Sequence, residues 1–192
     1  MRLFVALDFP DAVRHALREL MASLRPQAKH ARWVRAEAMH ITLKFIGETA
    51  ESHLESIRAA LSALRSPQPA VMHFRGLGFF PHERRPRVLW VGVEASPNVA
   101  GLASAIDKAL EPIGIPRETR DFVPHLTLAR FENPAGLEKL VGTAENLAST
   151  DFGSTVEREF YLYESVLKRS GAEYARLAAF PFVGAEAAPK DS

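Results

Sequence analysis

The sequence contains no cysteine among its 192 residues. That absence excludes disulfide bonds, thiolate metal sites and a cysteine nucleophile, and it is typical of a cytosolic protein. Long apolar runs are also missing. No stretch approaches the roughly 18 apolar residues of a membrane span, and Asp8 and Pro10 interrupt the apolar start too early for a signal peptide. We therefore expect a cytoplasmic protein without a membrane partner.

A strong excess of charge is lacking too. The formal net charge is +1, so no global basic field marks a nucleic-acid binder, and a surface of that kind must be local. Glycine-rich phosphate loops, the G-x-S-x-G elbow and the dinucleotide fingerprint are absent. The sequence therefore offers no site for ATP-dependent ligation, and we expect no cofactor.

One pattern occurs twice, in MHITLKF at 39–45 and PHLTLA at 124–129. Each copy is a His, an apolar residue, a Thr and another apolar residue, within a run that predicts a buried strand. Residues i and i+2 of a strand share a face, roughly 7 Å apart, so each copy presents an imidazole beside a hydroxyl. One copy alone is typical of a strand histidine with a satisfied hydrogen bond. Random placement of seven His and seven Thr gives about 0.06 such copies, so finding two indicates a function.

Two histidines that face each other suit general acid–base catalysis. Their unperturbed pKa near 6.5 lets one be neutral while the other is protonated near neutral pH. In-line displacement at phosphorus needs these two groups on opposite sides of the phosphate, and threonine hydroxyls can donate hydrogen bonds to its non-bridging oxygens. Such a site needs no metal. It has no covalent nucleophile, so water or an attached 2′-hydroxyl must attack.

Helical and strand patterns alternate along the chain. Strands are expected over 2–7, 71–80 and 87–94, and a hairpin over 159–167 and 174–182; helices are expected after Asp11, Thr49 and Ser96, with a weaker one from Asn133. Because the strands pair through hairpins as well as crossovers, the pattern favours an α+β fold with antiparallel sheet.

The spacing of the two motifs predicts an internal duplication. They lie 85 positions apart (125 − 40), and each is followed by a helix. We expect two lobes, each an antiparallel sheet with helices on the outside, related by a pseudo-twofold axis and separated by the active-site cleft. The chain is predicted to form one domain over residues 1–184, with a disordered tail over 185–192.

The paired motifs, HITLKFIG at 40–47 and HLTLAR at 125–130, resemble the signatures of the 2H phosphoesterases. Flanking segments narrow the resemblance to the bacterial and archaeal RNA 2′,3′-cyclic phosphodiesterases, also called the 2′-5′ RNA ligase family. These segments lie at 2–8, 31–34, 87–92 and 180–182, and the resemblance covers about residues 1–183.

The resemblance implies a metal-independent enzyme that opens a terminal RNA 2′,3′-cyclic phosphate to a 2′-phosphomonoester. It also implies a reverse-type activity that joins tRNA halves through a 2′-5′ linkage. His40 would be the proton donor to the leaving 3′-oxygen and His125 the proton acceptor that activates water, although the near-symmetry of the motifs leaves this polarity open. Thr42 and Thr127 would bind the phosphate.

Two cations beside the motifs are secondary candidates. Lys44 follows Thr42 on the same strand face, where it adds positive charge to the cleft or lies at its solvated mouth. Arg130 falls on the opposite face by strict alternation, and only a bulge or a strand end would turn it towards phosphate. Its place after the second motif resembles the family, and Arg suits bidentate phosphate contacts.

Two further positions are candidates for binding RNA. The basic loop at 81–87 carries Arg84 and Arg85 next to Phe79 and Phe80, so it either holds single-stranded RNA or is a solvated hairpin loop. Phe9, at a strand-to-helix turn, is either a base-stacking platform or a core residue.

We interpret the chain as a monomeric hydrolase acting on RNA with 2′,3′-cyclic phosphate ends, tRNA fragments among them. Three alternatives stay open: a phosphodiesterase for another cyclic nucleotide or 2′-5′ oligonucleotide, a non-catalytic module that binds RNA ends, and a metal hydrolase using the same histidines. The last lacks the expected carboxylate partners in the sequence.

Overall fold

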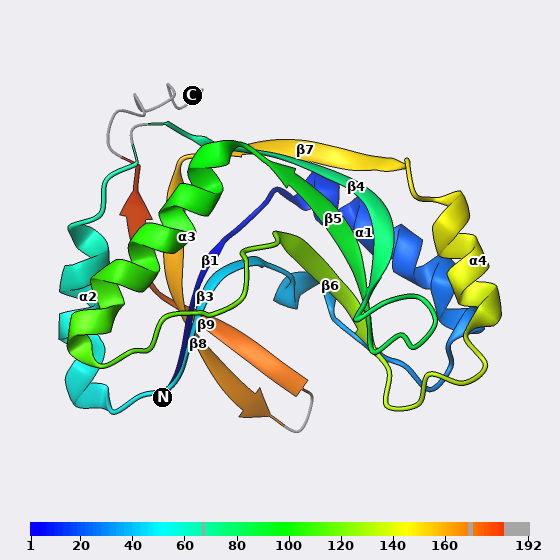
Figure 1. The fold of residues 1–192 in the computed structure, drawn as a ribbon, viewed down its shortest axis with the longest axis horizontal. Coiled ribbons are helices and arrows are strands. Elements are labelled where there is room, and N and C mark those ends of the chain that lie inside the picture. Colours follow the sequence, from blue (N-terminus) through cyan, green and yellow to red (C-terminus); the bar gives the residue numbers. More distant parts are fainter. Residues whose placement is uncertain (67, 169–170, 183–192) are drawn as a thin grey trace.

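Two antiparallel sheets form the framework of the protein (Figure 1). The computed structural model describes residues 1–66, 68–168 and 171–182, so the predicted tail at 185–192 lies outside the described residues. The four-stranded sheet has the order β3 (Ile41–Glu48), β1 (Arg2–Leu7), β8 (Glu159–Lys168), β9 (Gly171–Pro181). The five-stranded sheet has the order β2 (Arg32–Trp33), β6 (His125–Arg130), β5 (Val88–Ala95), β4 (Ala70–Phe80), β7 (Asp151–Glu157).

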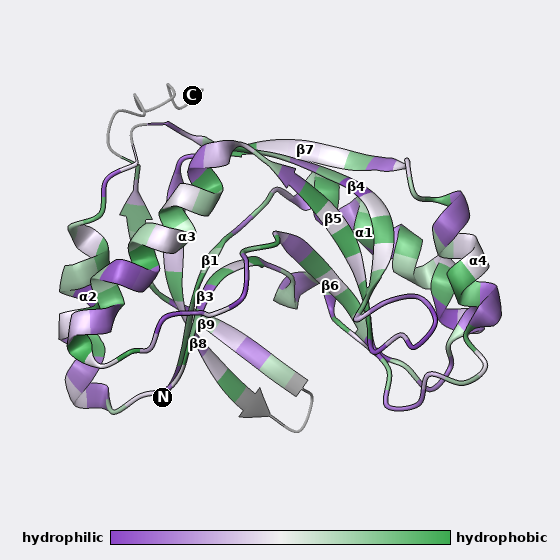
Figure 2. Cartoon of the chain, viewed as in Figure 1, coloured by the Kyte–Doolittle hydropathy of each residue, from purple (hydrophilic) through white to green (hydrophobic). Residues whose placement is uncertain are grey.

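Four helices cover the outer sides of the two sheets. Helices α2 (Leu54–Ser62) and α3 (Pro97–Leu110) pack on the four-stranded sheet, and α1 (Asp11–Leu24) and α4 (Glu138–Asn146) pack on the five-stranded sheet (Figure 1). Helices α1, α2 and α3 bury apolar stripes at helical spacing; in α1 this stripe includes Val13, Leu17, Leu20 and Leu24. Helix α4 begins at Glu138, later than the start expected at Asn133. Figure 2 shows green and purple residues alternating along these helices.

The two halves of the chain are interleaved in these lobes. The first half supplies β1, α1, β3, α2 and β4, and the second repeats the order with β5, α3, β6, α4 and β8, with β7 inserted before β8. The pairs β1–β3 and β5–β6 belong to different sheets, but β4 pairs with β5 and β8 pairs with β1. Each sheet therefore contains strands from both halves, and the predicted α+β fold with two sheets is confirmed.

Strand β7 was not expected from the sequence. Among the described residues it is an edge strand that pairs with β4, and its residues are exposed or half-buried. Only Phe152 and Val156 are large apolar residues in this segment, so the period-two signal that identifies a strand is weak.

Among the described residues, no helix combines the length and the hydropathy that crossing a membrane requires.

A β-bulge follows the Thr of each motif. Thr42 pairs with Ala6 and Lys44 pairs with Val5, so Leu43 is an extra residue in β3. In the same way, Thr127 and Ala129 pair with consecutive residues of β5, and Leu128 is the extra residue in β6. A bulge reverses the side-chain alternation of the strand beyond it.

The bulge makes the expected position of Lys44 wrong. Its side chain turns away from the face that carries Thr42 and is only 6% exposed. The Lys44 Nζ lies 2.5 Å from Asp107 Oδ1 on α3 and donates a hydrogen bond to the Pro116 carbonyl at 2.6 Å. Lys44 therefore joins β3 to α3 and its following loop inside the protein.

This ion pair predicts a loss of stability when one partner is removed. Lys44→Met should lower the free energy of unfolding by about 3 kcal/mol, because it leaves the Asp107 carboxylate largely buried without its cation. Urea denaturation measures this loss. The double variant Lys44→Met/Asp107→Leu should regain most of it, and Lys108→Met, at an exposed neighbour on α3, is the control. Equal stability of Lys44→Met and wild type would contradict a structural role for the pair.

Candidate active site

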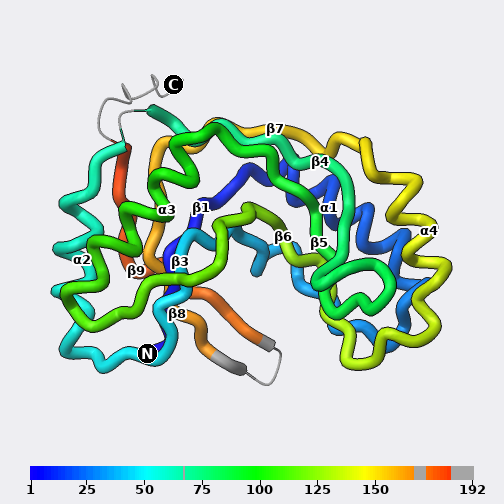
Figure 3. Tube along the Cα trace, in the orientation of Figure 1, coloured from blue at the N-terminus to red at the C-terminus, as the bar shows by residue number. Residues whose placement is uncertain are grey.

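The two motif strands meet at the centre of the molecule. Strands β3 and β6 contact each other across the two sheets, as the tube in Figure 3 shows for segments distant in the sequence. His40, Thr42, His125 and Thr127 line one cleft of about 440 Å³. The cleft predicted from the double motif is therefore present in the structure.

Each histidine ring is held by a carbonyl two residues before it. His40 Nδ1 lies 3.1 Å from the Ala38 oxygen, and His125 Nδ1 lies 2.8 Å from the Val123 oxygen. A carbonyl oxygen only accepts, so Nδ1 must carry the proton in both rings. The other nitrogen, Nε2, is then the acceptor when the imidazole is neutral and a second donor when it is protonated. Both rings can thus exchange protons through Nε2.

Aromatic side chains surround His40. Its ring stacks on Phe4 with centroids 4.4 Å apart and an interplanar angle of 27°, and it meets the edge of Tyr174 at 5.0 Å. Burial among these rings lowers the pKa of His40 from 6.5 to about 4, while the Ala38 hydrogen bond and the nearby Asp8 carboxylate act in the opposite direction. His40 is therefore neutral at neutral pH.

The surroundings of His125 are different. Its ring meets the edge of Phe80 on β4, with centroids 5.0 Å apart and an interplanar angle of 85°. The Phe80 ring in turn packs against Trp90 on β5 at 5.3 Å. One histidine is enclosed by rings from the four-stranded sheet, and the other rests on an aromatic pair of the five-stranded sheet.

The two bulges give the cleft one cation and one exposed aromatic ring at matching positions. Arg130 lines the cleft, because the bulge at Leu128 turns it to the face of Thr127. Phe45, at the same position after the first motif, also lines the cleft and is 63% exposed. Because the alternation is reversed, Arg130 faces the cleft, as the resemblance to the family suggests. Phe45 takes the place in the cleft where Lys44 was expected.

Phe9 is a core residue, and its interpretation as a base-stacking platform is wrong. Its side chain is 4% exposed and packs against Phe74 on β4, with centroids 5.3 Å apart. The Arg14 guanidinium lies over the Phe9 ring, 4.2 Å from the ring centroid. Phe9 is therefore covered from both the sheet and the helix.

Arg84 and Arg85 lie in the exposed loop between β4 and β5, which Figure 2 shows as a hydrophilic segment. Neither is among the residues lining the cleft, and neither side chain has an ion pair within the described part of the chain. The loop begins directly after Phe80, which contacts His125. The loop that carries these exposed arginines therefore begins beside the site.

Arg2, Phe45 and Tyr174 are among the cleft-lining residues that sequence reasoning missed. Arg2 comes from β1 and Tyr174 from β9, and Phe45 follows the first motif. Strict alternation assigned Phe45 to the opposite face, whereas Arg2 and Tyr174 reach the cleft through strand pairings that no local pattern reveals.

Among the described residues, no group of three or more His, Asp or Glu side chains is arranged to hold a metal ion.

The doubled motif falls within two matches to a known family of phosphoesterases. The family model described as LigT like Phosphoesterase matches the chain twice, over residues 7–90 and 91–174. Each match contains one His-x-Thr motif. The chain belongs to this family, and the two consecutive matches agree with the predicted duplication.

Curated relatives extend over nearly the whole chain. The RNA 2′,3′-cyclic phosphodiesterase of Archaeoglobus fulgidus is 34% identical over 182 residues, covering 94% of this chain and 99% of the relative. The protein of the same name from Thermus thermophilus is 34% identical over 193 residues, covering 96% and 91%.

Solved structures agree with the fold. The crystal structure of TT0787 of Thermus thermophilus has a TM-score of 0.80 and 32% identity, covering 97% of this chain and all of the other. E. coli LigT complexed with 3′-AMP has a TM-score of 0.74 and 25% identity, covering 95% and 98%.

The low pKa of His40 predicts how stability depends on pH. The folded-state pKa of about 4 is below the ordinary 6.5, so the unfolded chain binds a proton at a pH where the folded protein does not. Neutral His40 therefore contributes stability above about pH 6.5, and this contribution, up to about 3 kcal/mol, is lost as the pH falls towards 4.

Denaturation curves of wild type and His40→Gln between pH 7 and 4 measure this contribution. The variant should lose less stability on acidification, because Gln does not titrate. His15→Gln, at an exposed position on α1, is the control and should follow wild type. Parallel pH dependences for wild type and His40→Gln would show that the folded protein does not disfavour the imidazolium.

Proposed function

We propose that this protein hydrolyses RNA 2′,3′-cyclic phosphate ends to 2′-phosphomonoesters by two-histidine acid–base catalysis. The observation that carries the proposal is the pair of His-x-Thr strands lining one cleft, with each ring held through Nδ1. The names of the relatives, RNA 2′,3′-cyclic phosphodiesterases, support the substrate class. We expect the enzyme to act as a monomer in the cytoplasm, without metal or cofactor.

In this mechanism His125 accepts a proton from water, and the water oxygen attacks phosphorus. The bond from phosphorus to the 3′-oxygen breaks, His40 Nε2 donates a proton to that oxygen, and the phosphate stays on the 2′-oxygen. The hydroxyls of Thr42 and Thr127 donate hydrogen bonds to the non-bridging oxygens as charge shifts towards them.

His40 must be protonated to act as the acid, although burial lowers its pKa to about 4. A bound phosphate anion close to the ring favours the imidazolium, because an opposite charge within hydrogen-bonding distance raises the pKa of a histidine. Binding of the substrate phosphate therefore favours the protonated form of His40. An acid with a low intrinsic pKa then gives up its proton readily to the leaving oxygen.

Residues around the motifs extend the proposed site along an RNA strand. Arg130 contacts the phosphate, and the exposed ring of Phe45 offers a surface on which a base can stack. Arg84 and Arg85 attract the backbone of a longer RNA. A preference for oligonucleotides over cyclic mononucleotides follows from these contacts.

The same bond change permits ligation. If the 5′-hydroxyl of a second RNA attacks in place of water, the 3′-oxygen leaves again and a 2′-5′ phosphodiester results. Joining of tRNA halves through this linkage is the corresponding reverse-type activity. The described site would need only to admit the second strand beside His125.

We expect wild-type protein to convert a short RNA 2′,3′-cyclic phosphate to the 2′-phosphate in the presence of EDTA. His40→Ala and His125→Ala should each lose a factor of about 10² or more in rate, as is typical when an acid or base is removed. His53→Ala, which changes a histidine outside the cleft lining, is the control and should retain the rate. Phosphate-position analysis of the product by nuclear magnetic resonance completes the measurement.

Each other outcome points to a different function. Binding without turnover by folded wild type would indicate a module that recognises RNA ends, and turnover abolished by EDTA would indicate a metal hydrolase. Equal rates on mononucleotides and longer RNA would indicate a different cyclic-nucleotide substrate.

Replacing the bridging 3′-oxygen by sulfur tests which histidine is the acid, because a thiolate leaves without a proton. This substrate should rescue His40→Ala far more than His125→Ala.

A further inference from the structure

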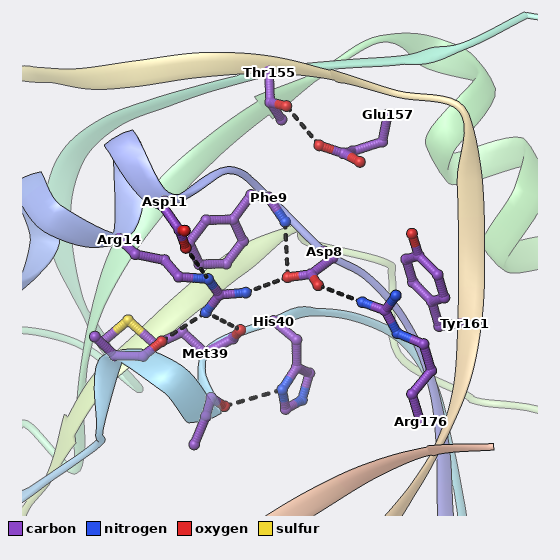
Figure 4. A network of polar contacts seen from close by, with 12 residues as sticks. Asp8, Phe9, Asp11, Arg14, Met39, His40, Thr155, Glu157, Tyr161 and Arg176 are labelled. Atoms are coloured by element: carbon purple, nitrogen blue, oxygen red, sulfur yellow. Dashed lines mark hydrogen bonds and ion pairs between the residues drawn. The ribbon is translucent and has the colours of Figure 1, made fainter. Parts of the chain in front are cut away.

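Arg14 on α1 reaches the turn that precedes the first motif. Its Nη1 donates to the Ala36 carbonyl at 2.7 Å and to the Met39 carbonyl at 3.1 Å, while Nη2 bonds the Asp8 carboxylate. The side chain is only 12% exposed, and its guanidinium lies over the Phe9 ring. Figure 4 shows these contacts converging on one side of His40.

Asp8 links the Arg14 guanidinium to the four-stranded sheet. Besides Arg14, its Oδ1 accepts the Phe9 backbone N–H at 2.9 Å, and its Oδ2 accepts Arg176 Nη2 at 2.8 Å. Arg176 belongs to β9 and lies over the ring of Tyr161 on β8, 3.7 Å from the centroid. The carboxylate therefore fixes the guanidinium of Arg14 relative to the four-stranded sheet.

The turn held by Arg14 contains the acceptor of His40. Residues Ala36–Ala38 form a 3₁₀ turn, and the Ala38 carbonyl accepts the hydrogen bond of His40 Nδ1–H. Arg14 binds the carbonyls at positions 36 and 39, one on either side of this acceptor. Anchoring the carbonyls at positions 36 and 39 leaves the two peptide groups between them little freedom to rotate, because the chain has only two soft dihedrals per residue.

His125 lacks such a clamp. Its acceptor, the Val123 carbonyl, belongs to a residue that is 55% exposed, in a coil segment before β6. Within the described residues, the nearby Arg120 pairs with Glu118 of its own segment, and no side-chain donor reaches the carbonyls on either side of Val123. The two motifs are thus alike in sequence and unlike in their support.

We propose that Arg14 and Asp8 are a positioning pair for His40. Together they hold the 36–39 turn so that the Ala38 carbonyl keeps the proton of His40 on Nδ1 and aims Nε2 at the cleft. The kinetic consequence rests on the proposed function, in which His40 protonates the leaving oxygen. The structural consequence, a fixed tautomer and orientation of one ring, does not depend on the reaction.

The charges of the pair also suit an imidazolium. Arg14 alone would repel a protonated His40, and its influence lowers the pKa of the ring; the Asp8 carboxylate raises it. Pairing therefore supplies the hydrogen-bond donors of a guanidinium without an uncompensated positive charge beside the acid. Lysine could not replace Arg14, because its single ammonium lacks the planar fork that bonds two carbonyls and a carboxylate at once.

The test compares Arg14→Leu, Arg14→Lys and Asp8→Asn with wild type. Arg18→Leu is the matched control: Arg18 lies one turn further along α1 and bonds the same 36–39 turn, but only through the exposed Glu37 side chain at 3.0 Å. The measurements are kcat and KM on an RNA 2′,3′-cyclic phosphate, together with the ¹⁵N shifts of both imidazole nitrogens of His40 and His125.

We expect both Arg14 variants to lose about 10- to 100-fold in kcat with KM changed less than threefold, since a misplaced acid slows the chemical step without weakening binding. The His40 nitrogens should shift from one tautomer towards an average of two, while His125 keeps its shifts. Asp8→Asn should change the His40 shifts in the same direction. Arg18→Leu should keep the wild-type rate and shifts.

A folded Arg14→Leu protein with wild-type His40 shifts would overturn the positioning pair. If Arg14→Leu does not fold, Arg14→Lys decides by the same shifts, since it retains the charge and loses the fork. Failure of the proposed function has a different signature: wild type shows no turnover, or His40→Ala keeps the wild-type rate. The nitrogen shifts would still decide whether Arg14 and Asp8 position the ring.

Discussion

The site depends on one backbone feature, the extra residue that follows the Thr of each motif. At Leu43 and at Leu128 the strand gains a residue relative to its partner, so the alternation of side chains reverses. The His and the Thr before each bulge lie on the cleft face. The second residue after each bulge, Phe45 or Arg130, returns to that face. Without the bulges, Phe45 and Arg130 would point into the two cores and Lys44 would face the cleft.

Duplication supplies two similar halves, and small differences between them give the cleft a direction. Strands β4 and β8 each join the sheet of the other half, which holds the motif strands face to face. At matching positions one half contributes a ring, Phe45, and the other a cation, Arg130. The turn before His40 is anchored by the half-buried guanidinium of Arg14, whereas Val123, before His125, is exposed. We propose that these differences let the two histidines take opposite roles at one phosphate.

The sequence alone predicted the family, the two-sheet α+β fold and the double motif, and these predictions are confirmed. Their signals are local: apolar stripes of helices and a His-x-Thr pattern in strands. The position of Lys44 was predicted wrongly, and the sequence left open whether Phe9 stacks on a base or lies in the core. Both depend on strand register or on contacts that join distant segments, such as Phe9 with Phe74. The roles of individual site residues, and the single-domain boundaries, stay predictions.

The central claim is that two histidines act on opposite sides of one phosphorus, with no covalent intermediate. The most direct measurement is the stereochemical course at phosphorus, using one diastereomer of a 2′,3′-cyclic phosphorothioate hydrolysed in ¹⁸O-labelled water. A single in-line displacement predicts inversion of configuration in the 2′-phosphorothioate product. Retention would require two displacements through an enzyme-bound intermediate, and it would contradict the account.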